Sequence, residues 1–521
     1  MTGNARGSES GGCSLSATTE QMEGSIVNEI GIGRSGLMMP TAYDTAWLAR
    51  VPAEHGGSGP AFPEALKWLR QSQWPDGSWG AEIEYIHDRV ISTLAAILAL
   101  AEWGEDDRCG RLIERGIEYI GKKADQLAHE NETIGFEVIL PTFLEKCRGF
   151  GSALSSPVVA RYKDMRDDKL AKIPGDMLYS RNTTLAFSSE FMGDDFDVGE
   201  AARLQENNGS VAVSPSATAY LLTKWPDNAA ARCYIADVAG AYGGRAPQVF
   251  PFDVFETAWS LWNLFLAGVA GGGAHRNAAH RNAEADQNPK VARHVADLKA
   301  LWDRGKGAGF SSGYSISDAD VSAMVFRVMR LAGLDPDPGP LYQFEWEDCF
   351  ICYPFERNAS VSANIHVLEA LKGIDRLRSA KVLKWLRSSQ VSGCYWIDKW
   401  HASPYYTTAH AVIALIGADD DLAKSAVQWI LDTQRPDGCW GYYDIPTAEE
   451  TAYCLQALGV YSRHVEPVRP EFFLRGREGL LGCARKMPAL WIGKCLYTPV
   501  RVVESAIVSA LTFSELAVTR R

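Results

Sequence analysis

Two acidic residues, Asp318 and Asp320, stand one apart immediately before an apolar segment with helical periodicity. A carboxyl group in such a place has two uses. It can accept hydrogen bonds from the free N–H groups of the first helical turn, which is the common case. Apolar surroundings can instead raise its pKa and keep it protonated as a general acid. The pair alone does not decide between a helix cap and an acid.

The elements that must position this pair are predicted to be helices. Apolar residues recur with helical spacing over residues 63–71, 90–103, 381–389 and 422–433, and the two-residue alternation of strands is rare. Clusters of Gly, Pro, Asn and Asp separate the periodic segments at loop-like intervals. The sequence therefore predicts an all-α protein built from many short helices.

A repeated unit organises these helices. Residues 68–80 read WLRQSQWPDGSWG and residues 429–441 read WILDTQRPDGCWG, with weaker copies at 205–210 and 385–396. In each copy a helix ends near a Gln, a Gly makes a turn and an aromatic residue follows. Each copy is predicted to be a unit of two helices joined by this turn. A single unit cannot bury its apolar face alone, so the units must stack. We expect the Gln to tie a helix end to the next turn and the Trp to fill the gap between outer and inner helices of two barrels.

Together, the repeats and the Asp-x-Asp motif resemble the class II terpene cyclases, and more closely their copalyl diphosphate synthase branch than the squalene–hopene cyclases. The resemblance covers roughly residues 25–515. Matching segments are PTAYDTAW at 40–47, FEVILP at 136–141, SPSATAY at 214–220, FPFDVFE at 250–256, PFERNASVSANIH at 354–366, DKWH at 398–401, SPYY at 403–406 and LWIGK at 490–494. The Asp-Asp-x-x-Asp motif with which class I enzymes ionise a diphosphate is not found in the sequence.

The resemblance implies two (α/α) barrel domains, the βγ arrangement of this family. We expect residues 25–60 and 250–521 to form the barrel that carries the Asp-x-Asp motif, and residues 61–249 to form the other. Residues 1–24 are predicted to be a flexible tail, and the Gly/Ala/Asn-rich segment 270–289 a surface insertion.

By resemblance, Asp320 is the acid that protonates an alkene and Asp318 is its partner. His366 matches the position whose His or Asn supports the acid; without the resemblance it would be interpreted as an ordinary core histidine. Val321 departs from the family motif, which has a further Asp there. We expect the activity to persist, with altered hydrogen bonding around the acid.

A carbocation needs apolar, electron-rich walls, and a desolvated aromatic face contributes about 2 kcal/mol by cation–π attraction. The candidates in matching motifs are Trp259, Tyr353, Trp400, Tyr405 and Tyr406, although plain packing explains any one of them as well.

The diphosphate of the substrate needs cationic partners, and Mg²⁺ is expected to bridge its oxygens. By resemblance, Lys172 and Lys399 are predicted to bind it, with Lys494 and Arg357 as weaker candidates. Ordinary surface solvation is the alternative for each lysine. The sequence does not locate the Mg²⁺ ligands.

Plant copalyl diphosphate synthases end the reaction with a His–Asn pair that holds a water. The matching positions here are Phe187 and Gln248, so the pair is missing. Another group must remove the last proton, and the product skeleton or double-bond position can differ.

Composition limits the remaining choices. The chain has 521 residues, 46% of them hydrophobic, and a net charge of −12 without a basic arm, which disfavours nucleic acid as a partner. No apolar run reaches the ~18 residues of a membrane span. The first 24 residues lack a hydrophobic core segment, so we expect no secretory signal, a cytoplasmic location and reduced thiols for the 11 Cys.

The sequence thus predicts a class II diterpene cyclase that converts geranylgeranyl diphosphate to a bicyclic, labdane-related diphosphate, which a separate class I enzyme would use. A homodimer is an option that the sequence leaves open. The alternatives are a farnesyl diphosphate cyclase with a drimane-type product, and an inactive isoprenoid-binding helical-repeat protein, which Val321 keeps open.

Overall fold

The computed structural model describes residues 10–54, 57–104, 106–128, 132–150, 157–269, 288–354, 356 and 358–519. Helices dominate these residues, and the only strands among them are β1 (Trp491–Ile492) and β2 (Leu496–Tyr497), which pair as a short antiparallel hairpin. The predicted all-α class is confirmed. No helix in the described ranges is long and apolar enough to span a lipid bilayer.

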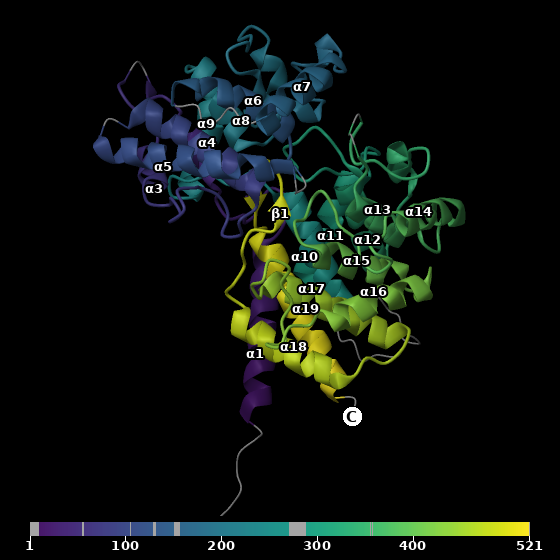
Figure 1. The fold of residues 1–521 in the computed structure, drawn as a ribbon. Coiled ribbons are helices and arrows are strands. Elements are labelled where there is room, and N and C mark those ends of the chain that lie inside the picture. Colours follow the sequence, from purple (N-terminus) through teal and green to yellow (C-terminus); the bar gives the residue numbers. More distant parts are fainter. Residues whose placement is uncertain are drawn as a thin grey trace, which may run out of the picture.

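The helices form two barrels, which lie one above the other in Figure 1. In the first barrel, consecutive inner helices pack against each other and the last packs against the first, which closes the ring. Its inner helices are α10 (Asp253–Ala267), α12 (Ala319–Leu331), α13 (Val361–Leu371), α15 (Pro404–Leu415), α17 (Ala448–His464) and α19 (Val500–Thr519). Its outer helices are α1 (Ser10–Glu29), α11 (Pro289–Trp302), α14 (Arg376–Ser388), α16 (Asp420–Asp432) and α18 (Pro470–Cys483).

The second barrel closes in the same way with a smaller ring. Its inner elements are α2 (Ala42–Ala49), α4 (Ile86–Trp103), α6 (Phe136–Lys146), the 3₁₀ helix η6 (Thr184–Met192) and α8 (Pro215–Lys224). Outside them lie α3 (Pro63–Leu69), α5 (Asp107–Lys123), α7 (Pro157–Ala171) and α9 (Ala229–Ala241). Short 3₁₀ segments connect elements of this barrel: η2 (Ala124–Ala128), η3 (Arg148–Phe150), η5 (Gly175–Met177) and η7 (Ala201–Leu204). A further one, η8 (Gly339–Phe344), lies between α12 and α13 of the first barrel.

Sequence patterns explain the two layers. Inner helices such as α4 are buried on nearly every face, whereas the outer α5 alternates buried and exposed residues with helical period. Several inner helices begin at a Ser or Thr whose hydroxyl accepts from the first turn, as Ser214 does for α8 and Ser403 for α15. A Pro follows directly in both cases, where its missing N–H costs nothing.

Hydrogen bonds within the repeated unit connect neighbouring helices of each barrel. Gln434 Nε2 donates to the carbonyls of Gly438 and Phe472 at 3.0 and 3.1 Å, and so ties the end of α16 to its own turn and to α18. Gln73 makes the equivalent bonds in the second barrel. The indole of Trp440 is fully buried and donates to the Ile430 carbonyl at 2.8 Å. These contacts confirm the predicted roles of Gln and Trp in the repeat.

The N-terminal elements divide between the barrels. Helix α1 includes residues 10–24 of the predicted flexible tail; it packs against α19, and Ile26 and Val27 are buried near its end. Residues 1–9 lie outside the described residues. Helix α2 instead belongs to the second ring. The exact domain boundaries stay a prediction, and the predicted insertion falls outside the described residues over 270–287.

Candidate active site

Asp318 and Asp320 lie at the start of the inner helix α12 and do different things there. Asp318 caps the helix, with Oδ1 accepting from the Val321 N–H at 2.7 Å. Burial raises the pKa of Asp318 well above its usual value, and the neighbouring Asp320 raises it further. The Tyr353 hydroxyl donates to Oδ2 of Asp318 at 3.5 Å. The capping function is therefore taken by Asp318, which leaves Asp320 free of it.

The carboxyl group of Asp320 meets a histidine from the next inner helix. Nδ1 of His366, on α13, lies 2.5 Å from Oδ1 of Asp320. The His366 side chain is 1% exposed and that of Asp320 is 12% exposed. Oδ2 of Asp320 makes no hydrogen bond with any described residue, and it is not among their fully buried polar atoms. One oxygen is thus held by His366, while the other remains accessible.

Aromatic side chains pack around this pair, as the sequence predicts for some of them. The Trp259 ring meets His366 edge to face at 5.5 Å between centroids, and its Nε1 donates to the Tyr406 hydroxyl at 3.1 Å. Tyr353 lies 6.5 Å from Trp400, near Asp318. Tyr405 points elsewhere, against the repeat residue Trp429 at 4.9 Å. The structure gathers Trp259, Tyr353, Trp400 and Tyr406 near the acidic pair and sets Tyr405 apart.

Three further aromatic residues extend this surface. Phe255 stacks on Trp259 at 3.7 Å, and Trp491 of the hairpin meets Phe255 edge to face at 5.3 Å. Tyr497, also on the hairpin, lies 6.3 Å from Trp491. None of these three was predicted as a site residue from the sequence, although Phe255 and Trp491 lie inside the segments that match the family.

The candidate diphosphate ligands do not converge on one point. Lys399 is half-buried, forms an ion pair with Glu356 at 2.7 Å and donates to the Asn358 carbonyl. Lys172 is exposed just after α7. Arg357 lies outside the described residues. Of the two described lysines, Lys399 is the one adjacent to the aromatic cluster, with its ammonium 5.0 Å from the Trp400 ring.

Lys494 is engaged by the protein itself. It lies between β1 and β2, is fully buried, and forms an ion pair with Glu190 of η6 at 2.7 Å. Its ammonium also donates to the Phe187 carbonyl at 2.7 Å and to the hydroxyls of Ser214 and Ser216 at 2.8 and 2.5 Å. An ammonium has three hydrogens to donate. Protein oxygens therefore occupy Lys494 fully, and the contact fastens the hairpin of the first barrel to the second.

Known proteins are similar to this chain in sequence and in fold. No family model matches the chain. A protein named type B diterpene cyclase from Mycobacterium tuberculosis is 38% identical over 495 residues, which cover 90% of this chain and 95% of that protein. The chain belongs to the class II diterpene cyclases. The solved ent-copalyl diphosphate synthase from Streptomyces platensis superposes on this cyclase with a TM-score of 0.75 at 27% identity, covering 96% of this chain and 99% of that one.

A plant structure shares the fold as well. The ent-copalyl diphosphate synthase from Arabidopsis thaliana, solved in complex with (S)-15-aza-14,15-dihydrogeranylgeranyl thiolodiphosphate, matches with a TM-score of 0.66 at 23% identity. The match covers 95% of this cyclase and 63% of the plant chain. The Streptomyces platensis structure confirms the expected resemblance to the copalyl diphosphate synthase branch.

The two positions that matched the plant His–Asn pair hold packing groups in this cyclase. The Phe187 ring meets Phe310 at 6.1 Å, which brings the second barrel against the first. Gln248 is buried; its Oε1 accepts from the Lys494 backbone N–H at 2.8 Å, and its Nε2 donates to the Cys495 carbonyl at 3.1 Å. Neither side chain is placed to act as a base.

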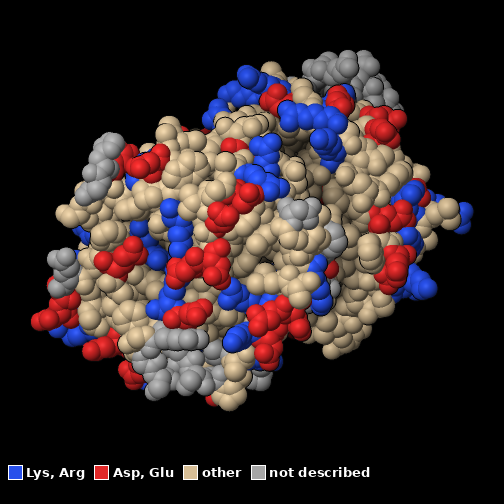
Figure 2. All heavy atoms as spheres, turned by 90° about the horizontal axis from the view of Figure 1, so that it is seen from above, with Lys and Arg blue, Asp and Glu red and all other residues tan. Residues whose placement is uncertain are grey.

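The described part of the cyclase contains no group of three or more His, Cys, Asp or Glu side chains placed to hold a metal ion. Mg²⁺ is commonly held by only one or two carboxylates together with substrate phosphates, so the Mg²⁺ requirement stays a prediction. On the face shown in Figure 2, acidic and basic side chains are interleaved and do not gather into one basic stripe.

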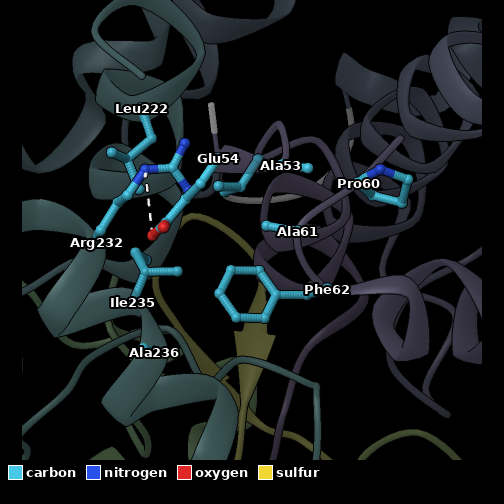
Figure 3. Close-up of a pocket in the computed structure, with 10 residues that line it drawn as sticks. Ala53, Glu54, Pro60, Ala61, Phe62, Leu222, Arg232, Ile235 and Ala236 are labelled. Atoms are coloured by element: carbon cyan, nitrogen blue, oxygen red, sulfur yellow. Dashed lines mark ion pairs between the residues drawn. The ribbon is translucent and has the colours of Figure 1, made fainter. Parts of the chain in front are cut away.

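A pocket of about 330 Å³ lies in the second barrel (Figure 3), and its lining does not include Asp318, Asp320 or His366. Apolar side chains including Phe62, Leu222 and Ile235 line it, and Arg232 reaches Glu54 at 4.0 Å beside them. The lining residues come from the segment after α2 and from α8 and α9, so the pocket is separate from the candidate active site.

Proposed function

We propose that this class II cyclase converts geranylgeranyl diphosphate to a bicyclic, labdane-related diphosphate and retains the diphosphate group. Support for a twenty-carbon substrate comes from the diterpene cyclase name of the Mycobacterium tuberculosis relative and from the geranylgeranyl analogue bound in the Arabidopsis structure. The retained diphosphate would leave the product available to a separate class I enzyme.

The contact between Asp320 and His366 carries the proposal. Asp320 is the acid: the O–H bond at its Oδ2 breaks, a C–H bond forms at the terminal alkene of the substrate, and the neighbouring tertiary carbon becomes a cation. The other alkenes attack in turn and close two rings. The carboxylate left on Asp320 is stabilised by the hydrogen bond that His366 Nδ1 donates to Oδ1. Loss of a proton from the final cation leaves the atoms of the substrate unchanged in number, so the reaction is an isomerisation.

The surroundings favour this chemistry in two ways. Asp318 is buried beside Asp320, and burial together with the neighbouring carboxyl group raises the pKa of Asp318, which favours the neutral form of Asp318. Trp259, Trp400 and Tyr406 offer aromatic faces, and each desolvated face contributes on the order of 2 kcal/mol to a nearby cation.

Among the candidate cations, Lys399 is the one that we propose for the diphosphate. It is half-buried, and it lies beside Trp400 and one residue after the buried Asp398. It would have to exchange its ion pair with Glu356 for the diphosphate. Lys172 is a second candidate on the strength of the resemblance alone. Mg²⁺, if it takes part, would neutralise diphosphate oxygens, and no protein step depends on it here.

The substrate is tested by incubating the purified chain separately with farnesyl and geranylgeranyl diphosphate, each with and without Mg²⁺. Phosphatase treatment then releases the alcohols for gas chromatography–mass spectrometry. The proposal predicts a bicyclic primary alcohol from geranylgeranyl diphosphate. A drimane-type alcohol from farnesyl diphosphate alone would replace the substrate assignment, and linear alcohols from both would contradict the proposed activity.

A further inference from the structure

A second buried histidine, His410, lies next to His366 on the side away from Asp320. His410, on α15, places Nδ1 at 2.8 Å from Nε2 of His366, so that Asp320, His366 and His410 form a continuous chain of hydrogen bonds. His410 is 1% exposed and stacks on Trp262 at 4.6 Å with an angle of 22° between the rings. It has no contact with the accessible oxygen of Asp320 and so cannot touch the substrate at the point of protonation.

The plane of the His410 ring is fixed by its neighbours. Trp262, on α10, is anchored by the hydrogen bond from its Nε1 to Glu369 at 3.2 Å, and Glu369 in turn accepts from Arg327 at 2.9 Å. The Tyr406 ring lies 4.3 Å away on α15. Helices α10, α12, α13 and α15 are consecutive members of the closed inner ring, so the histidine pair is held between helices that pack against one another.

His410 is neutral in this place. Burial holds the pKa of His410 well below its usual value, and the nearby His366 and His401 lower it further. A neutral imidazole carries one proton, on Nδ1 or on Nε2. Nε2 of His410 is buried and makes no hydrogen bond with any described residue. A proton there would leave a buried N–H group unpaired, which proteins avoid more strictly than an unpaired acceptor. The proton therefore belongs on Nδ1.

This assignment sets the direction of the whole chain. If His410 Nδ1–H donates to Nε2 of His366, the proton of His366 must be on its Nδ1, and it donates to Oδ1 of Asp320. The acidic proton of Asp320 is then left on Oδ2, which no described residue binds. With the opposite direction, Asp320 would donate its own proton to His366, and the acid would be withdrawn from the alkene.

We propose that His410 is a positioning residue that fixes the tautomer of His366 and thereby keeps the acidic proton on Oδ2 of Asp320. The inference rests on the proposed role of Asp320 as the acid. The other strong candidate is Lys494, whose ammonium already donates to protein oxygens and points to no ligand.

A double-mutant cycle separates this role from plain packing. His410→Phe keeps a ring to stack on Trp262 and removes the donor. His366→Asn puts an amide nitrogen at the place of Nδ1, and that nitrogen donates to Asp320 whatever His410 does. We expect His410→Phe to lower kcat by about 10- to 100-fold at unchanged KM, which is the range for such supporting partners. In the His366→Asn background, the same change should cost less than about 3-fold, because the tautomer no longer matters.

A purely structural role predicts the same factor in both backgrounds, and that result would overturn the inference. His464→Phe, at the exposed end of α17, is the control for loss of a histidine and should change kcat by less than about 2-fold, as for a distant, independent site. Thermal unfolding of every variant shows whether the fold is intact.

A direct measurement of the tautomers does not depend on turnover. In the full chain with ¹⁵N-labelled histidine, the ¹⁵N resonances should show a protonated Nδ1 and an unprotonated Nε2 for both His366 and His410. The two single variants assign these resonances to their residues. A proton on Nε2 of His410 would refute the inference. If the wild-type chain cyclised neither prenyl diphosphate, the proposed function would fail, and the spectrum would still decide the tautomers.

Discussion

Nδ1 of His366 and Oδ1 of Asp320 lie 2.5 Å apart although 46 residues separate them in the sequence. The contact spans two neighbouring inner helices, α12 and α13, and binds only one oxygen of the carboxyl group. The second oxygen of Asp320 therefore has no hydrogen bond to a described residue. Asp318 differs, because its carboxyl group caps helix α12.

Replacement of His366 tests the contact. His366→Ala removes the donor that stabilises the carboxylate after proton transfer, and kcat should fall by about 10- to 100-fold with little change in KM. His366→Asn retains a donor at nearly the same place and should recover most of this loss. Steady-state turnover of geranylgeranyl diphosphate measures both. An Ala variant as active as wild type would show that His366 does not support the acid.

Lys494→Met should damage stability and leave the diphosphate site intact. The substitution leaves the carboxylate of Glu190 buried without its partner, which costs about 3–5 kcal/mol when one half of a buried ion pair is removed. Adding Glu190→Gln removes the unpaired charge and should restore part of the unfolding free energy. Urea denaturation measures the stability. A stable Lys494→Met enzyme with a raised KM would instead favour the role in substrate binding that the sequence predicts for Lys494.

The repeats offer a matched pair of glutamines. Gln434→Ala breaks two hydrogen bonds between layers and should lower the unfolding free energy by about 2 kcal/mol, at about 1 kcal/mol for each bond. Nε2 of Gln390, in the degenerate copy, has no hydrogen-bond partner in the described part of the chain. Gln390→Ala should therefore cost less than about 1 kcal/mol. Equal losses in the two variants would show that the Gln bonds do not join the layers.

The buried carboxyl group of Asp88 should make the unfolding free energy depend on pH. Burial raises the pKa of this carboxyl from 3.8 to about 6, against the hydrogen bonds from Ala81 and Leu496. Between these two pH values the folded chain binds the proton more tightly than the unfolded chain does, so the unfolding free energy falls as the pH rises through this window. At about 1.4 kcal/mol per pKa unit, the contribution of Asp88 is on the order of 3 kcal/mol.

The comparison that isolates this contribution uses Asp88→Asn. The variant loses one hydrogen bond because its amide cannot accept from both backbone N–H groups, and it carries no charge at any pH. Its unfolding free energy should therefore fall less steeply than that of the wild type as the pH rises from 3.8 to about 6. Parallel urea denaturation curves across this window, with equal slopes for both chains, would assign the pH dependence to other groups.

The sequence allows the architecture and part of the site to be predicted, for identifiable reasons. Helical periodicity and the Gln–Gly–Trp units are local patterns, and the contacts of Gln434 and Trp440 follow from them. The meeting of Asp320 with His366 was foreseen from the motifs that surround each residue, and the catalytic roles of both stay predictions.

Other features depend on contacts that local patterns do not encode. Lys494 was predicted as a diphosphate ligand from the motif around it. Its actual partner, Glu190, is 304 residues away in the chain and belongs to the other barrel. His410 is surrounded in sequence by apolar residues of α15 and has the signature of a core position. Only the closed ring of inner helices brings it behind His366.

The central claim is that Asp320 donates the proton that starts cyclisation. Asp320→Asn keeps the shape of the side chain and removes the acid, and Asp303→Asn, which loses a surface ion pair with Lys299, is the matched control. Each purified chain is incubated with geranylgeranyl diphosphate, and the alcohols released by phosphatase are analysed by gas chromatography–mass spectrometry. The wild type and Asp303→Asn should yield the bicyclic alcohol, and Asp320→Asn only linear geranylgeraniol, because the loss of a general acid costs about 100-fold or more. Cyclisation by folded Asp320→Asn within about tenfold of wild type would contradict the claim.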